Sequence, residues 1–487
     1  MRTRASAIGL WGGVVLSVLV YLLVPAEMVD AQGAASQLSP AGRIVLALMC
    51  LMAAWWIFEA IPIYVTALLP LLLLPVTGVQ SFAETAVSYG HPIIFLAFSG
   101  FAIAAALEKW HVHRRIAIAI VSVAGQSPRR LIAALMLASA LLSMWISNTA
   151  TAILMLPVAL SLIDSHDADA GASPNFAPCL LLAICYSCSM GGMTTLTGTT
   201  TNMFFAGYLD SELGRPVSFA AWMGFSGPIA VVMLAAIWFL LTFVLFPLRR
   251  ARLGSGAAQM LEQQSVNEPW TSGGLRTASV FVCVALCWFA LPLLERVPGL
   301  QALDMYIVGT AGVLALFVVR SKGRDGEPLL DWGTARGRIP WGILLLIGGG
   351  LSLAAAFSRF GVSEFLALQV AELNQLPLAV VFLVVVALMV FLTEVTTNVA
   401  SLTALTPVFA SVAVSLRIEP AVVIALLAVA ASCAFMLPVA TPPNAIVFGS
   451  ERIRIGQMAR AGICFNVLAI VVITTWGYFF AETFFGD

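Results

Sequence analysis

The sequence predicts an all-α protein that crosses a membrane many times. Hydrophobic residues make up 61% of the 487 residues and charged residues only 10%, against roughly 25% charged residues in an ordinary soluble domain. The apolar stretches are also long: residues 131–163 and 178–209 contain no Asp, Glu, Lys or Arg. Because a helix needs about 20 apolar residues to cross the hydrocarbon core, each of these stretches is long enough to span a bilayer.

Loop charges predict the orientation of the spans. Clusters of Lys and Arg are expected in the cytoplasm, and they lie at residues 2–4, 109–130, 249–252, 320–338 and 452–460. Residues 26–41, 164–175 and 482–487 carry neither Lys nor Arg, so these three segments are expected outside. A cytoplasmic N-terminus and an external C-terminus require an odd number of crossings, and about eleven fit the apolar segments, with half-spans left over.

The N-terminal segment, residues 1–25, places Arg2 and Arg4 before an apolar run. We interpret it as the first membrane span, because further spans follow and no small-residue cleavage pattern stands cleanly after it. A secretory signal that is removed is the alternative interpretation.

The two halves of the chain repeat one pattern. Residues 98–112 (FSGFAIAAALEKWHV) align without a gap with residues 348–362 (GGGLSLAAAFSRFGV), at an offset of 250. The same offset pairs further residues: Ser143 with Thr393, Ser147 with Thr397, Asn148 with Asn398 and Pro157 with Pro407. Residues 197–202 (TGTTTN) match residues 439–444 (VATPPN) after a small deletion. Polar matches at one offset favour an internal duplication over chance in so apolar a chain.

The duplication predicts the domain organisation. We expect an N-terminal span with an outer loop (1–41), a first repeat (42–248), a cytoplasmic linker (249–274) and a second repeat (275–487). Each repeat contains an odd number of predicted crossings, so the second is expected to be inverted relative to the first. Inverted repeats are a common plan of secondary transporters, with the binding site near the midplane where the repeats meet.

The first repeated motif has the composition of a broken helix. Four polar residues stand in the middle of a stretch too long for one untilted span: Ser143, Ser147, Asn148 and Thr149. Ser143 and Ser147 are four apart and are expected on one helix face, whereas Asn148 and Thr149 favour helix caps over helix interiors. We therefore expect the helix to break near Asn148, and the second repeat to break in the same way between Thr393 and Asn398.

A broken helix offers two kinds of ligand. Its free carbonyl groups suit a hard cation such as Na⁺, and its free N–H groups and positive dipole end suit an anion. The alternative is that these polar residues only hold helices together, as they often do in membranes. Because the cluster occurs in both repeats, we favour a binding site.

A second pair of motifs also interrupts regular helix. Residues 191–202 are too rich in Gly and Thr for a plain lipid-facing helix, and Pro443 disfavours helical geometry at Pro442. We expect helix breaks or re-entrant hairpin tips here. Non-helical backbone at this depth is tolerated where it is buried in protein or lines a cavity, so both segments are expected to add carbonyls and hydroxyls to the site.

The four motifs contain no Lys, Arg or His, and Glu394 is the single acid within the second repeat's Thr/Asn motif. An anion bound there would therefore rely on hydroxyls, amides, helix dipoles and nearby Na⁺. For Glu394 we prefer a hydrogen-bonded structural role over that of a proton carrier, and we also assign Glu108 a structural role.

With these motifs, the chain resembles the divalent anion:sodium symporter family, which carries dicarboxylates, citrate and sulfate, and it is similar to the bacterial dicarboxylate type. The resemblance runs from residues 55–62 (WWIFEAIP) through residues 340–344 (PWGIL) to residues 432–444 (SCAFMLPVATPPN), and the Ser-Asn-Thr signature stands at residues 147–149. It implies a homodimer in the inner membrane, eleven spans with two re-entrant hairpins, and a transport domain that moves like an elevator against a scaffold domain.

The resemblance also implies the site residues. The first Na⁺ site would use Ser143, Ser147, Asn148 and Gly198. The second Na⁺ site would use Thr393, Thr396, Asn398 and Ala440. Substrate carboxylates would meet Asn148, Thr149, Thr199, Thr397, Asn398 and Pro442. Na⁺ is the coupling ion, and no organic cofactor is expected.

Two departures from the family pattern concern the substrate. Val399 replaces the Thr of the usual Ser-Asn-Thr in the second repeat, which removes one hydroxyl. Thr200 and Thr201 stand where the family commonly has Pro-Pro, which makes the first break more polar. The change at Val399 puts the identity of the substrate in doubt more than that of the coupling ion.

The function expected from these observations is Na⁺-coupled symport of a C4-dicarboxylate such as succinate, malate or fumarate. Symport of sulfate or a tricarboxylate, or Na⁺-independent dicarboxylate exchange, are alternatives within the family, and an anion channel is the alternative from another class. An enzyme is not expected, because the spans hold no HExxH motif and no Asp in their interiors. The net charge of zero gives no electrostatic reason to expect a nucleic-acid partner.

Overall fold

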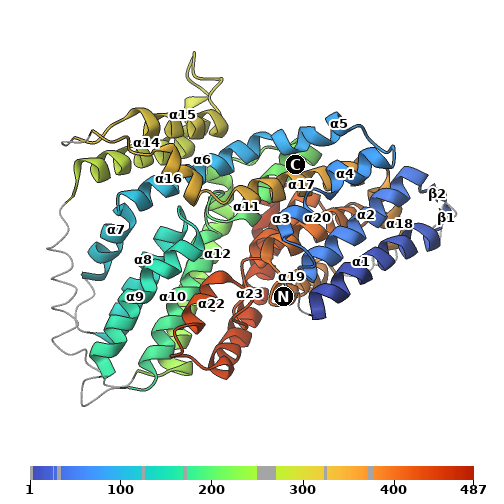
Figure 1. Cartoon of the computed structure of the whole chain (residues 1–487). Helices are drawn as coiled ribbons and strands as arrows, with labels where there is room; N and C mark the ends of the chain where they lie inside the picture. Colours follow the sequence, from blue (N-terminus) through green and yellow to red (C-terminus); the bar gives the residue numbers. More distant parts are fainter. Residues whose placement is uncertain are drawn as a thin grey trace.

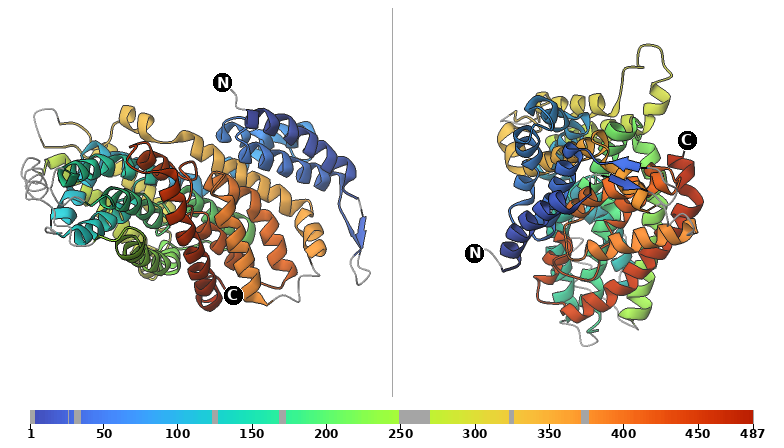
Figure 2. Two further views of the ribbon diagram at one scale, coloured as in Figure 1. Left: turned by 90° about the horizontal axis from the view of Figure 1, so that it is seen from below. Right: turned by 90° about the vertical axis from the view of Figure 1, so that its right-hand side faces the viewer.

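The computed structural model describes residues 4–25, 27–29, 35–122, 127–167, 173–248, 270–322, 326–370 and 377–486. The regular secondary structure of these residues is helical apart from an isolated bridge and one short hairpin, in which strands β1 (Glu27–Val29) and β2 (Ala35–Gln37) pair antiparallel. The hairpin connects α1 (Arg4–Leu23) to α2 (Pro40–Ile57), and these two helices lie side by side at one end of the molecule (Figures 1 and 2).

The remaining helices fall into two series. The first comprises α3 (Ile63–Thr66), α4 (Leu69–Val76), α5 (Phe82–Ala86), the 3₁₀ turn η1 (Val87–Gly90), α6 (Pro92–Lys109), α7 (Val112–Ser122), α8 (Pro128–Ser143), α9 (Asn148–Asp167), α10 (Phe176–Gly192), α11 (Thr200–Leu213), α12 (Phe219–Phe239) and the π-helical turn η2 (Leu240–Leu245). The second comprises α14 (Ser272–Leu294), α15 (Met305–Val318), α16 (Trp332–Arg338), α17 (Trp341–Arg359), α18 (Val362–Val370), α19 (Leu378–Leu392), α20 (Asn398–Ser415), α21 (Pro420–Ala430), α22 (Pro442–Phe448) and α23 (Ile455–Phe485).

The order of helices from α6 to α11 recurs from α17 to α22. In each run a long helix is followed by a short one, then by two helices joined through a connection of a few residues, and then by two helices separated by a non-helical stretch. Even the prolines inside the helices correspond, with Pro157 in α9 and Pro407 in α20. The two runs therefore have the same element order at nearly the same spacing.

Among the described residues, nine helices are long and apolar enough to cross a membrane, and five shorter apolar helices have 10–17 residues. Outer helices leave much of their apolar surface uncovered. On α1, for example, Trp11 is 69% exposed and Leu23 is 73% exposed. Exposed apolar surface of this extent is expected where lipid replaces water around the protein.

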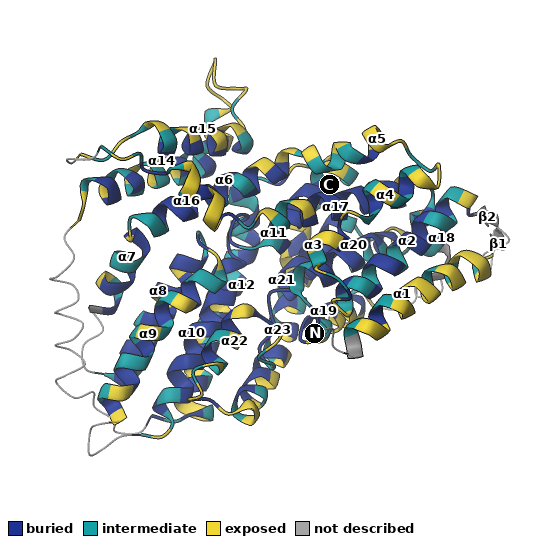
Figure 3. Cartoon of the chain, viewed as in Figure 1, coloured by how far each residue is buried: buried dark blue, intermediate teal, exposed yellow. Residues whose placement is uncertain are grey.

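The core of the molecule is built on two helices that are buried on nearly every side, α10 and α21 (Figure 3). Their residues are mostly small or apolar, so neighbouring helices approach them all around. Helices α8 and α9 lie side by side against α10 (Figure 1), and α19 and α20 both pack against α21. Each core helix ends at one of the non-helical stretches, so these stretches lie deep in the protein.

Two parts of the predicted orientation conflict in the structure. Residues 164–175 were expected on the opposite side from the basic clusters, but Arg452 forms ion pairs with Asp164 (2.7 Å) and Asp167 (3.3 Å). At the other end of the same segment, the side-chain amide of Asn175 donates to the carbonyl of Pro247, 3.3 Å away, close to the 249–252 cluster. The external assignment of residues 164–175 and the cytoplasmic assignment of the 452–460 cluster therefore conflict, because α9 returns alongside α8 and brings the two segments together.

Two helices begin close to predicted domain boundaries, which stay predictions. α2 begins at Pro40, before the expected start of the first repeat at residue 42, and α14 begins at Ser272, inside the expected linker of residues 249–274. Residues 249–269 of that linker lie outside the described residues.

Candidate functional site

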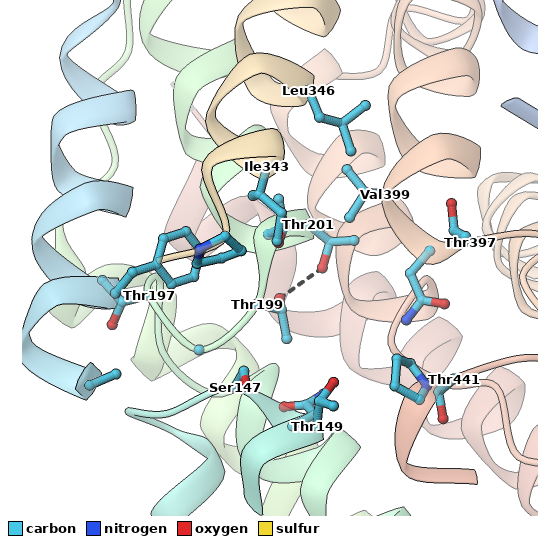
Figure 4. A pocket seen from close by; sticks show the side chains of 18 of the residues that line it. Ser147, Thr149, Thr197, Thr199, Thr201, Ile343, Leu346, Thr397, Val399 and Thr441 are labelled. Carbon is cyan, nitrogen blue, oxygen red and sulfur yellow. Dashed lines mark hydrogen bonds between the residues drawn. The ribbon is translucent and has the colours of Figure 1, made fainter. Parts of the chain in front are cut away.

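A cavity of about 610 Å³ opens where the helix connections of the two runs meet, within the range of roughly 300–1,000 Å³ typical of small-molecule sites. One wall consists of the connections and breaks of α8–α11 and α19–α22, and the other wall comes from α3, α6, α16 and α17. Figure 4 shows Ser147, Thr199, Thr441 and Val399 around this cavity.

Nine of the twelve predicted site residues line the cavity. They are Ser147, Asn148, Thr149, Gly198, Thr199, Thr397, Asn398, Ala440 and Pro442, and they include the complete set predicted to contact substrate. The other three, Ser143, Thr393 and Thr396, are buried behind its surface. All three were predicted only as Na⁺ ligands, so the structure separates a surface layer from a deeper layer of hydroxyl groups.

The deeper layer is joined to the surface layer by one contact that occurs twice. The hydroxyl of Ser143 donates to Oδ1 of Asn148 at 2.6 Å, and the hydroxyl of Thr393 donates to Oδ1 of Asn398, also at 2.6 Å. The two pairs are 250 residues apart, as the sequence repeat requires. Each pair brings a hydroxyl and an amide oxygen together where one helix ends and the next begins.

The local geometry of the first connection differs from the prediction. Ser143 is the last residue of α8 and Ser147 lies in the connection, so the expectation that they share a helix face is wrong. The hydroxyl of Ser147 accepts from the N–H of Ala150 at 3.1 Å and thus caps α9, as Ser commonly does at this position. Asn148 is then the first helical residue, and its side chain is free to turn back toward Ser143.

The non-helical stretches after α10 and α21 are held by two asparagines that the sequence analysis had not assigned to the site. Asn202 donates its amide hydrogens to the carbonyls of Gly192 (3.1 Å) and Thr195 (2.7 Å). Asn444 donates to the carbonyls of Ala434 and Leu437, each at 3.1 Å. Donors and acceptors correspond at one offset of 242. The sequence repeat shows this offset, but it does not predict these hydrogen bonds.

Thr199 and Thr441 cap the helices that follow these stretches. The hydroxyl of Thr199 accepts from the N–H of Asn202 at 3.3 Å, and the hydroxyl of Thr441 accepts from the N–H of Asn444 at 3.4 Å. These caps explain why α11 and α22 begin where they do, at the cavity wall.

The first predicted Na⁺ site has a backbone that only glycine allows. A Cβ atom at Gly192 would lie 2.2 Å from Oδ1 of Asn148, and a Cβ atom at Gly198 would lie 2.3 Å from the carbonyl oxygen of Gly192. The amide oxygen of Asn148 therefore lies against bare backbone. Closely spaced neutral oxygens of this kind fit a hard cation, which prefers oxygen ligands.

The second predicted Na⁺ site is richer in hydroxyl groups. Besides its bond to Asn398, the hydroxyl of Thr393 lies 3.2 Å from the carbonyl oxygen of Ala431. The hydroxyl of Thr396 contacts that of Ser401. Ala440 lines the cavity nearby, and it is 4% exposed. The oxygens of this site thus come from the α19–α20 connection and the stretch after α21.

The first residues of four helices line the cavity. Asn148 begins α9, Thr200 begins α11, Asn398 begins α20 and Pro442 begins α22. The N-terminus of a helix carries free N–H groups and a partial positive charge of about half an elementary charge. Several such ends around one cavity favour an anion even though the motif residues themselves bear no cation.

The two halves differ at the positions flagged in the sequence. Thr149 and Val399 both line the cavity, so the missing hydroxyl changes its surface. The hydroxyls of Thr199 and Thr201 lie 2.8 Å apart (Figure 4), in the break where Pro442 and Pro443 stand in the other half. The hydroxyl of Thr397 is buried and has no hydrogen-bond partner among the described residues.

Glu394 is a buried carboxylate that fastens the second connection to the stretch after α21. It is 3% exposed. Its two oxygens accept from the consecutive N–H groups of Phe435 (2.7 Å), Met436 (2.9 Å) and Leu437 (3.0 Å), and from the side-chain amide of Asn466 (2.8 Å). A carboxylate with four donors fits the structural role predicted for it.

Two charged residues on the opposite wall were not foreseen as part of the cavity. Glu108, at the end of α6, and Arg338, at the end of α16, both line it. Nη1 of Arg338 lies 3.0 Å from Oε2 of Glu108. Nothing in the local sequence signals this proximity, because the two residues are 230 positions apart.

A neighbouring ion pair fastens the same two helices outside the cavity. Nζ of Lys109 lies 2.9 Å from Oδ2 of Asp331, which caps α16 by accepting from the N–H of Thr334 at 2.9 Å. Hydrogen bonds from Thr334 and from Lys109 lower the pKa of Asp331 well below its usual range. This carboxylate therefore stays charged at neutral pH and holds α6 and α16 together.

The chain was compared with known protein families. A family model described as "Sodium:sulfate symporter transmembrane region" matches residues 14–485. A "Sodium-dependent dicarboxylate transporter SdcS" of Staphylococcus saprophyticus is 35% identical over 488 residues, which covers 98% of this chain and 92% of that protein. A protein of the same name from Staphylococcus aureus is 35% identical over 453 residues, covering 90% of this chain and 86% of that protein.

Solved structures show a similar fold at low identity. The Alcanivorax borkumensis YdaH transporter has a TM-score of 0.60 at 14% identity and covers 98% of both chains. Neisseria gonorrhoeae MtrF, described as illuminating a class of antimetabolite efflux pumps, has a TM-score of 0.63 at 12% identity, covering 99% of this chain and 95% of that one. At these identities the likeness concerns the fold alone.

Proposed function

This chain belongs to the sodium:sulfate symporter family, and from that membership we propose that it couples the movement of Na⁺ to the transport of a C4-dicarboxylate such as succinate, malate or fumarate. The substrate class is supported by the two relatives named as sodium-dependent dicarboxylate transporters, each 35% identical to this chain. The observation that carries the proposal is the repeated hydroxyl–asparagine pair beside one cavity, at Ser143–Asn148 and Thr393–Asn398.

The repeated pairs support two Na⁺ sites. The first is proposed to use Ser143, Ser147, Asn148 and Gly198, and the second Thr393, Thr396, Asn398 and Ala440. Two bound cations would add positive charge beside the cavity, close to the helix N-termini that already favour an anion. Binding of Na⁺ would then strengthen binding of the dianion, which is the thermodynamic requirement for coupling.

The substrate is proposed to lie between the two pairs. Asn148 and Thr149 would donate to one carboxylate with Thr199, and Asn398 and Thr397 would donate to the other near Pro442. An amide or hydroxyl donor binds a carboxylate without the strong attraction of a buried cation, and such a site can release its ligand. The hydroxyl of Thr397, which has no hydrogen-bond partner in the part of the chain that the structure describes, supports this, because a buried polar group without a partner is costly unless a ligand supplies one.

The architecture is proposed to contain eleven crossings and two re-entrant hairpins. The sequence favoured hairpin tips or helix breaks at residues 191–202 and 440–444. Because α8 and α9, and likewise α19 and α20, are joined by connections of a few residues, we instead propose these two helix pairs as the hairpins. Residues 1–41 would form the N-terminal span and loop, residues 42–248 and 275–487 two inverted repeats, and residues 249–274 the linker between them. The proposed transport domain holds the hairpins and breaks, and it would move like an elevator against α3, α6, α16 and α17. We propose a homodimer in the cytoplasmic membrane, with the N-terminus inside and the C-terminus outside.

Uptake of radiolabelled succinate into proteoliposomes, with and without an inward Na⁺ gradient, tests the function. We expect saturable, gradient-driven uptake that counter-flow accelerates. Uptake of sulfate or citrate in place of succinate would contradict the substrate. Succinate exchange that ignores Na⁺ would contradict the coupling, and flux that neither saturates nor responds to counter-flow would indicate a channel.

A further inference from the structure

The cavity has one charged pair, and that pair does not belong to the repeated motifs. In the described part of the chain, the residues with a charged side chain that line the cavity are Glu108 and Arg338. Their side chains are 25% and 40% exposed, whereas Ser143 and Thr393 are fully buried. The pair therefore lies toward solvent and the hydroxyl–asparagine pairs lie deeper.

Arg338 has unused capacity to bind an anion. A guanidinium group has five N–H donors in a planar fork that matches a carboxylate. Within the described residues, the hydrogen bond to Glu108 is the one that Arg338 donates from its side chain. Its remaining donors are thus available to a second carboxylate that arrives through the cavity.

A purely structural role for this pair is weakly supported, because the adjacent contacts already join the two helices. Lys109 binds Asp331 and also donates to the carbonyl of Pro328 at 3.1 Å. The indole N–H of Trp110 donates to the carbonyl of Leu329 at 2.7 Å. These contacts lie outside the cavity and already hold α6 against α16 and the residues just before it. The pair of Arg338 and Glu108 is therefore not needed to join the two helices.

The charges of Glu108 and Arg338 determine how the pair interacts with a dianion. Glu108 alone would repel an incoming dicarboxylate, and Arg338 cancels that charge. When a substrate carboxylate approaches, it competes with Glu108 for the guanidinium group. Because surface ion pairs are weak, typically about 0–1 kcal/mol, such an exchange costs little.

We propose that Arg338 and Glu108 form an anion-exchange subsite at the solvent side of the cavity, in which a substrate carboxylate takes the place of Glu108 on Arg338 during passage to or from the deeper site. The inference rests on the proposed function and adds a contact outside the repeated motifs. Arg338 belongs to a predicted cytoplasmic loop, residues 320–338, so the subsite serves the cytoplasmic face.

The test compares the two faces of the membrane. Michaelis constants are measured in right-side-out and inside-out vesicles for the wild type and the variants Arg338→Gln, Arg338→Lys and Glu108→Gln. The anion is the one that the wild type carries among succinate, sulfate and citrate. We expect Arg338→Gln to raise the constant at the cytoplasmic face about tenfold, the size of one lost charge-assisted hydrogen bond. The Michaelis constant at the external face should differ from that of the wild type by less than about twofold.

The other variants separate charge from structure. Arg338→Lys should recover most of the affinity, and Glu108→Gln should lower the cytoplasmic constant because the competitor for Arg338 is gone. Lys109→Gln is the matched control, since it breaks an ion pair between the same segments outside the cavity; it should lower thermal stability without changing either constant.

Three outcomes would overturn the inference: an unchanged cytoplasmic constant in Arg338→Gln, an equal change at both faces, or an equal effect of Lys109→Gln. Failure of the proposed function is recognised separately. It would appear as sulfate or citrate transport by the wild type, and the same variants then test the subsite with that anion.

Discussion

Replacement of Glu394 by glutamine should loosen the stretch after α21 and weaken binding of Na⁺ at the second site. The carboxylate accepts from the three consecutive N–H groups of residues 435–437 and from Asn466. Glutamine keeps one acceptor oxygen. In place of the second oxygen it has an NH₂ group, which cannot accept from the N–H groups that this oxygen binds in the wild type. With the amide oxygen in the place of Oε1, the two bonds of Oε2 are lost, from the N–H groups of Met436 (3.1 Å) and Leu437 (3.0 Å). At about 1.5–3 kcal/mol each, this is roughly 3–6 kcal/mol in total.

Part of that loss is offset, because a neutral side chain no longer carries the cost of burying a charge. We therefore expect a net loss of about 2–4 kcal/mol. The loss should be local, since Glu394 connects the α19–α20 connection to the stretch whose Ala431 carbonyl lies 3.2 Å from Thr393. Displacement of this carbonyl should raise the Na⁺ concentration needed for half-maximal effect by about tenfold or more.

Thermal unfolding of the purified protein at increasing NaCl concentrations measures both effects. The wild type should be stabilised by Na⁺, and Glu394→Gln should have a lower melting temperature and respond only at higher Na⁺ concentrations. Glu364→Gln is the control, because Glu364 is exposed on α18. If Glu394→Gln melts like the wild type and keeps its response to Na⁺, the carboxylate does not hold the second site together and the reasoning is refuted.

Three further changes test other parts of the site. Gly192→Ala places a Cβ atom 2.2 Å from Oδ1 of Asn148, so stabilisation of the protein by Na⁺ should be largely lost. Gly456→Ala is the control, because its Cβ atom meets no atom within 4 Å. An equal response of both variants to Na⁺ would contradict a role of Gly192 in the Na⁺ site. Asn444→Ala leaves two carbonyls without their donor and should cost about 2 kcal/mol, measured by thermal unfolding; an unchanged melting temperature would count against a supporting role. Val399→Thr restores a hydroxyl at the cavity wall and should change the preference among succinate, sulfate and citrate in competition assays more than the Na⁺ dependence; the reverse result would count against the assignment of Val399 to substrate choice.

The sequence alone was sufficient for the class of protein and for most of the cavity-lining motif residues. Its apolar composition required helices in a membrane, and the polar residues repeated at an offset of 250 marked where those helices are interrupted. Nine of the twelve site residues that the family resemblance implied line one cavity. Their binding roles stay predictions, but their proximity follows from a simple cause: a helix that breaks inside a membrane must turn its free backbone groups toward a polar interior.

Local composition and spacing were less reliable for predicting where a helix ends and the chain reverses its direction. The low content of Lys and Arg in residues 164–175 favoured an external loop, yet Arg452 binds Asp164 from a predicted cytoplasmic cluster. The helix face expected to contain Ser143 and Ser147 also does not exist, because α8 ends at Ser143. Both discrepancies arise where a helix reverses, and a reversal depends on packing against α10 rather than on composition.

Only the tertiary structure decided which further residues complete the site. Asn202 and Asn444 support the two breaks, Glu394 ties one connection to the stretch after α21, and Arg338 pairs with Glu108 on the wall that faces the motifs. Spacing along a helix records which residues share a face within a few turns. A contact between residues more than 200 positions apart leaves no such periodic trace, because it depends on how whole helices pack. The repeated motif could therefore be recognised in the sequence, whereas the ion pair on the opposite wall of the cavity could not.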